Sequence, residues 1–337
     1  MHVVACKIVA YTGVLMALQF GTFVPQGWRL DLLEIADPVA KYEAMTHVAK
    51  AVDAIPVYDS IWVYDHFHTV PRIEHEAVFE AWTITAALAR DTQRVKLGQM
   101  VTCIGYRNPA LAAKIASTVD ILSHGRLYCG IGAGWYEHEW RAYGYGFPET
   151  RDRMRAFREA TQIMVKLWTE DAPTFEGEYF QIRGAINEPK GVQKPYPSLW
   201  IGGGGEQVTL KLVAQYGMAA NFGGDPATIS QKCAILGEHC AKLGRDYEAI
   251  IKSTNVNIVF VKAGDDLAQA TAQVRATYGW SVEELQQQAI VGTPEQVAER
   301  MAALRDAGIT YFITYFPRIA YDHTPLHSFA EQVAPLL

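Results

Sequence analysis

Asp65 and His66 are neighbours whose side chains can hold charge or exchange a proton near neutral pH. They follow an apolar run at 60–64 that has the composition of a buried strand. A second histidine, His68, lies two residues further along the chain. A histidine that only bonds a backbone carbonyl at a strand end would give the same pattern, so both a chemical and a structural role remain open.

A zinc site is not expected here, and we predict no metal. No HxxxH pair or cysteine lies at ligand spacing from His66 or His68. His138 and Glu139 offer a further acid or base, because they follow Trp135 by about one helical turn. They could reach the same site, or they could be exposed residues in the first turn of a helix.

A glycine-rich turn, Gly130–Trp135, ends another apolar run. It differs from the dinucleotide fingerprint GxGxxG, because Trp135 stands where the third glycine would fall. This difference excludes a Rossmann NAD site at the turn. The glycines around Ala133 would still let a planar ring approach the backbone closely.

A second glycine run, Gly202–Gly205, precedes a predicted helix. It lacks the Lys-Ser/Thr pair of a phosphate-binding P-loop. Free N–H groups of Gly203, Gly204 and Gly205 at a helix N-terminus would nonetheless attract a phosphate. A flexible turn without a ligand is the alternative.

The elements that must position these residues alternate along the chain. Apolar runs predict eight strands, at 18–24, 60–64, 95–103, 127–131, 199–201, 218–221, 250–261 and 311–316. Capping residues and helical spacing predict helices from 38 onward, at 76–90, 109–122 and 149–169, after 205, and at 226–243, 265–290 and 294–307. The helical region at 265–290 is expected to break near Gly279. In the helix at 109–122 the apolar residues Leu111, Ile115, Val119 and Leu122 share one face, which we expect to point inward.

Eight strands alternating with helices predict one (β/α)8 barrel over residues 16–337. Active sites of such barrels lie at the C-terminal ends of the strands, where Asp65, His66 and both glycine runs fall. Between the fourth predicted helix and the fifth strand, 172–197 forms an insertion with a hairpin at 175–180. We expect this insertion to act as a lid, and together with the loop at 317–323 to decide the substrate.

Composition excludes several other classes of protein. A net charge of −6 argues against general binding to nucleic acid or to an anionic membrane. The five scattered cysteines predict reduced thiols and a cytoplasmic location. We interpret residues 1–15 as an N-terminal extension and not as a targeting segment. Beyond this extension, the sequence has no uncharged apolar run long enough to predict a transmembrane helix.

Several segments together resemble the bacterial luciferase-like monooxygenase superfamily, and most closely its branch that uses the deazaflavin coenzyme F420. The resemblance runs from about Met16 to the C-terminus and is carried by WVYDHF (62–67), LGQMVTCIGYRNPALAAK (97–114), DILSHGRLYCGIGAGWYEHEWRAYG (120–144), PSLWIGGGGEQVTLKLVAQYG (197–217) and VGTPEQVAERMAALRDAGI (291–309). It implies a luciferase-like barrel, a small-molecule substrate and a homodimer.

The resemblance also implies roles for individual residues. His66 would lie by the reacting carbon and act in catalysis, and a bulge with a non-proline cis peptide at Met100-Val101 would back the central ring. Cofactor contacts are implied or expected for Asp65, Met100, Val101, Ala133, His138, Gly203, Gly204 and Gly205. A sugar-phosphate dehydrogenase of this family carries a catalytic Glu where this chain has Trp135, so its substrate need not be shared.

The resulting expectation is an F420-dependent oxidoreductase that passes a hydride between deazaflavin C5 and a small organic substrate. His66, with His138 and Glu139 as further candidates, would supply or take the proton. An FMN-dependent monooxygenase is one alternative, and a flavin-binding barrel without catalytic activity is another. The sequence does not identify the substrate.

Overall fold

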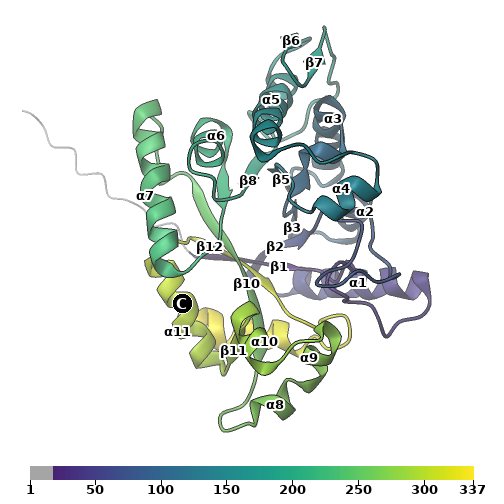
Figure 1. The fold of residues 1–337 in the computed structure, drawn as a ribbon, viewed down its shortest axis with the longest axis vertical. Helices are drawn as coiled ribbons and strands as arrows, with labels where there is room; N and C mark the ends of the chain where they lie inside the picture. The colour runs from purple at the N-terminus through teal and green to yellow at the C-terminus, as the bar shows by residue number, and fades with distance from the viewer. Residues whose placement is uncertain (1–17) are drawn as a thin grey trace, which may run out of the picture.

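The computed structural model describes residues 18–337, so the prediction for residues 1–15 lies outside the described part of the chain. Eight parallel strands form a closed barrel with helices around it (Figure 1). The barrel strands are β1 (Gln19–Phe23), β2 (Tyr58–Val63), β3 (Lys96–Gln99) continued by β4 (Thr102–Cys103), β5 (Leu127–Gly132), β8 (Ser198–Gly202), β9 (Ala219–Asn221), β10 (Ile251–Phe260) and β12 (Tyr311–Tyr315). Each barrel strand pairs in parallel with its neighbours, and β12 pairs with β1 to complete the circle. The predicted (β/α)8 barrel is confirmed.

Most predicted helices form close to their expected bounds. They are α1 (Pro38–Ala54), α2 (Ala81–Asp91), α3 (Pro109–Leu122), α5 (Thr150–Thr169), α6 (Thr209–Tyr216), α7 (Pro226–Leu243) and α11 (Pro294–Asp306). The Asp37, Asn108, Asp225 and Thr293 side chains each accept a backbone N–H of the helix that follows, and each precedes a proline that fits the first turn. Helix α2 starts five residues later than predicted, because Glu80 caps it by accepting from Trp82 and Thr83.

Two regions contain elements that the sequence pattern did not predict. A short helix, α4 (Glu137–Ala142), follows β5 directly. Strand β10 continues beyond the barrel and pairs with β11 (Ile290–Gly292), a pairing that was not predicted. The helical region predicted at 265–290 forms α8 (Leu267–Ala270), α9 (Ala272–Tyr278) and α10 (Val282–Gln288), and the predicted break near Gly279 lies between α9 and α10. The chain closes with α12 (Thr324–Ser328), η2 (Phe329–Val333) and η3 (Ala334–Leu336). Within 18–337 no helix is long and apolar enough to cross a bilayer.

The predicted apolar face of α3 points inward only in part, because Val119 is buried, Ile115 and Leu122 are half-buried, and Leu111 is exposed. Leu111 is 54% exposed, and the buried side of α3 consists mainly of small residues, Ala112, Ala113 and Ala116, together with Val119. Small residues allow α5 to pack closely, so that the Trp168 indole reaches α3 and donates to the Ala113 carbonyl.

The insertion at 172–197 forms the predicted hairpin, from β6 (Phe175–Glu176) and β7 (Gln181–Ile182). In Figure 1 this hairpin extends beyond the barrel beside α5. Further along, the Gln193 amide donates to Asp120 and to the carbonyl of Leu127, the first residue of β5. The insertion is therefore tied to the N-terminal end of the barrel, and the expectation that it forms a lid is wrong.

Large aromatic side chains fill the inside of the barrel. Trp62, Tyr128, Trp200 and Tyr311 are buried there and pack ring against ring. Gly98 leaves space for one of them, because a Cβ at this position would overlap the Trp62 ring. The barrel is a packed core, so a ligand must bind at one of its ends.

Candidate active site

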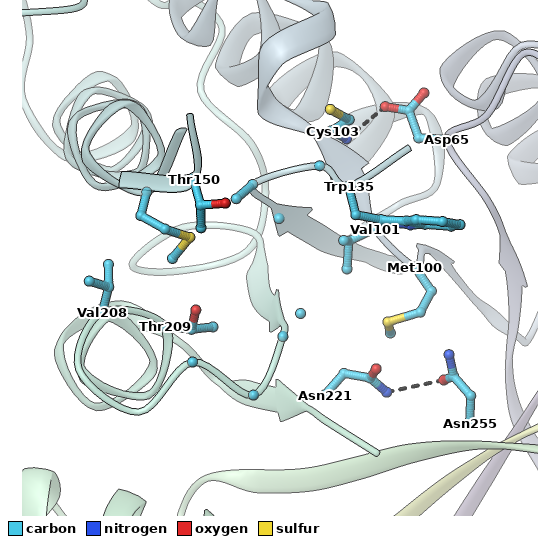
Figure 2. Close-up of a pocket in the computed structure, with 18 of the residues that line it drawn as sticks. Asp65, Met100, Val101, Cys103, Trp135, Thr150, Val208, Thr209, Asn221 and Asn255 are labelled. Carbon is cyan, nitrogen blue, oxygen red and sulfur yellow. Dashed lines mark hydrogen bonds between the residues drawn. The ribbon is translucent and has the colours of Figure 1, made fainter. Parts of the chain in front are cut away.

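A cavity of about 770 Å³ opens at the C-terminal ends of the barrel strands (Figure 2). It takes residues from the ends of β2, β5, β8 and β9, from the middle of β10, from the β3–β4 junction, and from the starts of α5 and α6. Of the predicted site residues, it brings together Asp65, His66, Met100, Val101, Ala133, Gly203, Gly204 and Gly205. Among the described residues, the cavity takes none from 172–197 or 317–323, so these segments do not shape it as expected.

His66 is held from two sides. Its ring lies parallel to the Trp28 indole, with centroids 4.3 Å apart and an angle of 3° between the planes. Its Nδ1 atom is 2.7 Å from the Oε2 atom of Glu139. Nε2 is therefore the nitrogen that remains available to the cavity, and the ring has little freedom to rotate.

Glu139 is completely buried and does not line the cavity. One carboxylate oxygen accepts the backbone N–H groups of Phe67 and His68, and the other contacts His66 and accepts from the Tyr106 hydroxyl. Burial alone would raise the pKa of Glu139, but the interaction with His66 and the two N–H donors outweigh burial and lower it. The ionised carboxylate fixes the Nδ1–H tautomer of His66.

The geometry separates the three residues expected to act as acid or base. Glu139 contacts His66 from behind, which makes it a positioning residue and not a group that reaches a ligand. His138, on the outer side of α4, is exposed and does not line the cavity. Its ring faces the His68 ring, with centroids 4.9 Å apart. His66 is the member of this group that lines the cavity.

Asp65 lines the cavity, but its carboxylate is already engaged. Both oxygens accept from the Arg107 guanidinium, at 2.6 and 2.9 Å, and one also accepts the Cys103 backbone N–H at 2.8 Å. Arg107 in turn contacts Glu80, the cap of α2. This buried ion pair and its neighbour hold the end of β2 against the loop that precedes α3.

The predicted bulge with a non-proline cis peptide at Met100-Val101 is confirmed. Gly98 pairs with Tyr128 and Thr102 with Ile131, so four steps along β3–β4 match three steps along β5. The glycines of the neighbouring strands make room for the extra residue. A Cβ at Gly132 would lie 2.5 Å from one methyl group of Val101, and a Cβ at Gly202 2.8 Å from the other. The glycines thus accommodate the bulge, and Val101 forms part of the cavity wall.

The second glycine run forms another wall of the cavity. The N–H of Gly203 donates to the Asn221 carbonyl and is not free, whereas the N–H groups of Gly204 and Gly205 have no partner within residues 18–337. Lys232 of α7 also lines this end and lies 2.8 Å from Glu206. Together with the Thr209 hydroxyl, these donors form a site suited to a phosphate.

A pair of amides lines the cavity, Asn221 at the end of β9 and Asn255 in the middle of β10. The Nδ2 atom of Asn221 donates to Ser253 at 3.0 Å and to the Oδ1 atom of Asn255 at 3.1 Å. Figure 2 shows this pair on the opposite side of the cavity from Asp65. Trp135, which is 62% exposed, lies between them.

Sequence reasoning missed several residues of the site. Trp28, Lys232 and Asn255 lie outside the quoted motifs, Arg107 lies in one without having been assigned a role, and the partners of all four lie far away in the sequence. The one available signal was position, since Asn255 lies inside a predicted barrel strand and polar residues are uncommon in such runs.

Comparisons with known proteins agree with this geometry. A family model described as luciferase-like monooxygenase matches residues 18–284. The chain is 29% identical to an F420-dependent glucose-6-phosphate dehydrogenase of Kineococcus radiotolerans, over 83% of this chain and 88% of that protein. It is 26% identical to an FMNH2-dependent dimethylsulfone monooxygenase of Pseudomonas putida, over 78% and 79%. The structure of an F420-dependent secondary alcohol dehydrogenase superposes with a TM-score of 0.78 at 20% identity, over 96% and 100%.

Proposed function

The chain belongs to the luciferase-like monooxygenase family and is an oxidoreductase, and we propose that it uses coenzyme F420 to reduce or oxidise a small organic substrate. The observation that carries this proposal is the buried contact of 2.7 Å between His66 and Glu139 at the cavity. It keeps an acid–base group oriented toward the place where a ligand would bind. The F420-dependent relatives support this choice of cofactor.

The cavity fits such a cofactor in two respects. The wall formed by Val101, Gly132 and Gly202 consists of one valine and two glycines, so a planar ring can lie against it. At the other end, the free N–H groups of Gly204 and Gly205 and the Lys232 ammonium can hold a phosphate. Asp65 would support the ring site indirectly, because its carboxylate is bound to Arg107.

The proposed mechanism gives separate tasks to His66 and Glu139. Gly204, Gly205 and Lys232 would hold the phosphate of F420, and the reduced cofactor would supply the hydride that a carbonyl carbon of the substrate receives. His66 donates a proton from Nε2 to the carbonyl oxygen, so that an alcohol forms, and in the opposite direction it accepts this proton. Glu139 stabilises the histidine in both protonation states, and Trp28 prevents rotation of its ring.

Equilibrium titration of the purified protein with F420 and with FMN tests the cofactor. We expect a dissociation constant in the micromolar range or below for F420, and weaker binding of FMN. Tighter binding of FMN would overturn the proposal. It would favour the second candidate, an FMN-dependent monooxygenase, which is supported by the similarity to the dimethylsulfone monooxygenase.

Two further expectations belong to this proposal. A homodimer is expected from the family resemblance, and the molar mass in solution, measured by light scattering, tests it. A cytoplasmic location is expected from the reduced cysteines. Cys103, Cys129, Cys233 and Cys240 are free and buried in the described part of the chain, which agrees with this expectation.

A further inference from the structure

We propose that the substrate is an uncharged organic molecule and not a phosphorylated sugar, and that Asn221 and Asn255 hydrogen-bond its polar group. This inference rests on the proposed function, because it assigns one end of the cavity to the cofactor phosphate. It differs from the substrate named for the glucose-6-phosphate dehydrogenase relatives.

The charges around the cavity support the first part of this inference, that the substrate is uncharged. Among the described residues that line it, Lys232 is the only lysine or arginine. It lies at the glycine run, beside Glu206, where we place the cofactor phosphate. Arg107 is close by, but its guanidinium is bound to Asp65 and Glu80. A second phosphate would therefore find no free lysine or arginine among the described residues that line the cavity.

A phosphate monoester carries about −1.5 to −2 charges near neutral pH. Moving such a group from water to the part of the cavity away from Lys232 is unfavourable, because its hydration is lost and no ion pair with a lysine or arginine replaces it. The part of the cavity near Asn221 and Asn255, where we place the substrate, therefore favours neutral molecules over phosphorylated ones.

The orientation of the Asn221 and Asn255 amides supports the second part of the inference, that they hydrogen-bond the substrate. The Ser253 hydroxyl donates to the Ala220 carbonyl, so its oxygen accepts from the Asn221 amide nitrogen. The same nitrogen donates to Oδ1 of Asn255. Its two hydrogens are thus both used, which leaves the Asn221 oxygen as an acceptor and the Asn255 NH2 group as a donor for a ligand.

Together these groups describe the molecule that would bind. An acceptor beside a donor suits a hydroxyl, carbonyl or amide group, none of which needs a charge. Trp135 and Met100 line the same cavity and offer apolar surface to a carbon skeleton (Figure 2). We infer a neutral ketone or secondary alcohol with an apolar body and a second polar group.

The test begins with the F420 titration of the wild-type protein, so that failure of cofactor binding is seen separately as failure of the proposed function. The F420-loaded protein is then assayed with glucose 6-phosphate and with a panel of neutral ketones and secondary alcohols that carry a second hydroxyl or amide group. We expect turnover of neutral compounds only, and no inhibition by millimolar inorganic phosphate. Turnover of glucose 6-phosphate, or of no neutral compound, would overturn the inference while the proposed cofactor stands.

Variants of Asn221 and Asn255 test whether these two amides bind the substrate. Asn221→Ala and Asn255→Ala should each raise KM for the neutral substrate about tenfold, the effect of losing one hydrogen bond, with the F420 dissociation constant unchanged. Asn257→Ala is the matched control, because Asn257 is on the same strand but does not line the cavity. Asn255→Lys should introduce inhibition by inorganic phosphate. Weaker F420 binding in Asn255→Ala would assign the pair to the cofactor and contradict the inference.

Discussion

Lys232 and Glu206 allow a prediction with two opposite outcomes. Lys232 lines the cavity beside the free N–H groups of Gly204 and Gly205, and its ammonium group is 2.8 Å from Glu206. If the cofactor phosphate binds there, Lys232 must turn from the carboxylate to the phosphate. Lys232→Gln should then weaken F420 binding, and Glu206→Gln should strengthen it.

The size of the effect follows from the exposure of the pair. A charge-assisted hydrogen bond contributes about 1.5–3 kcal/mol, and breaking a partly exposed ion pair costs about 0–1 kcal/mol. The side chains of Lys232 and Glu206 are 19% and 35% exposed, so the pair is partly screened. The remaining 1–2 kcal/mol or so corresponds to about 5–30-fold weaker binding in Lys232→Gln. Glu206→Gln removes one repulsive charge and should gain a few-fold.

Equilibrium titration followed by F420 fluorescence measures both changes. Lys211→Gln is the control. Lys211 is exposed on α6 and does not line the cavity, so its substitution changes the net charge of the protein by the same amount without changing the site. The effect of Lys232→Gln should also shrink as salt is added, since screening weakens the charge interaction. Equal effects of the two lysine variants, or weaker binding in Glu206→Gln, would refute the assignment of the phosphate to this end.

Three further predictions concern His66, Glu139 and the glycine run. His66→Ala should lower the rate of hydride transfer about 10²–10⁴-fold and change F420 affinity only a few-fold; His66→Asn should recover activity only if hydrogen bonding suffices, and single-turnover absorbance would show this. Glu139→Gln should slow the same step while the cavity remains intact. It should also destabilise the protein by about 1–3 kcal/mol at neutral pH. Because the folded protein lowers the pKa of Glu139 below its ordinary 4.5, the stabilisation is present above that pH and is lost as the pH falls through the lowered pKa. The free energies of unfolding of the variant and the wild type, measured by denaturation, should therefore converge at acid pH. A difference that stays constant with pH would contradict the role of the carboxylate. Gly204→Asp should weaken F420 binding by repelling the phosphate, and it is a cleaner test than Gly203→Asp, because Gly203 has a φ of 120° that strains any side chain; unchanged affinity would place the phosphate elsewhere.

Periodicity and caps predicted the barrel because they are local signals. The Asn108 cap and Pro109 lie next to each other in the sequence and define the start of α3 without any tertiary information. The same local reasoning failed for the buried face of α3. The spacing placed Leu111 on the inward face, but Leu111 is exposed and the buried side carries Ala112, Ala113 and Ala116. The Trp168 indole donates to the Ala113 carbonyl on this side.

The site was predictable where chemistry depends on position along a strand, and not where it depends on long-range partners. Asp65 and His66 follow the end of β2, so barrel geometry alone placed them at the active end. The burial of Glu139 could not be predicted, because the backbone N–H groups of Phe67 and His68 that it accepts lie more than 70 residues away in the sequence. Lys232 reaches the glycine run from α7, and no spacing in the sequence indicates that contact.

Val101 has a consequence for how the family's sequences can diverge. Its methyl groups occupy the space above Gly132 and Gly202, and the bulge brings the Gln99 carbonyl against Gly130. We therefore expect these three glycines and Val101 to change together in evolution. A side chain at any one of the glycines would clash unless the β3–β4 junction or residue 101 also changed. Among homologues, alanine or serine at 130, 132 or 202 should occur together with a shortened β3–β4 junction or a smaller residue at 101. The glycine motif of β5 would then serve as a sequence marker for the bulge on the neighbouring strand.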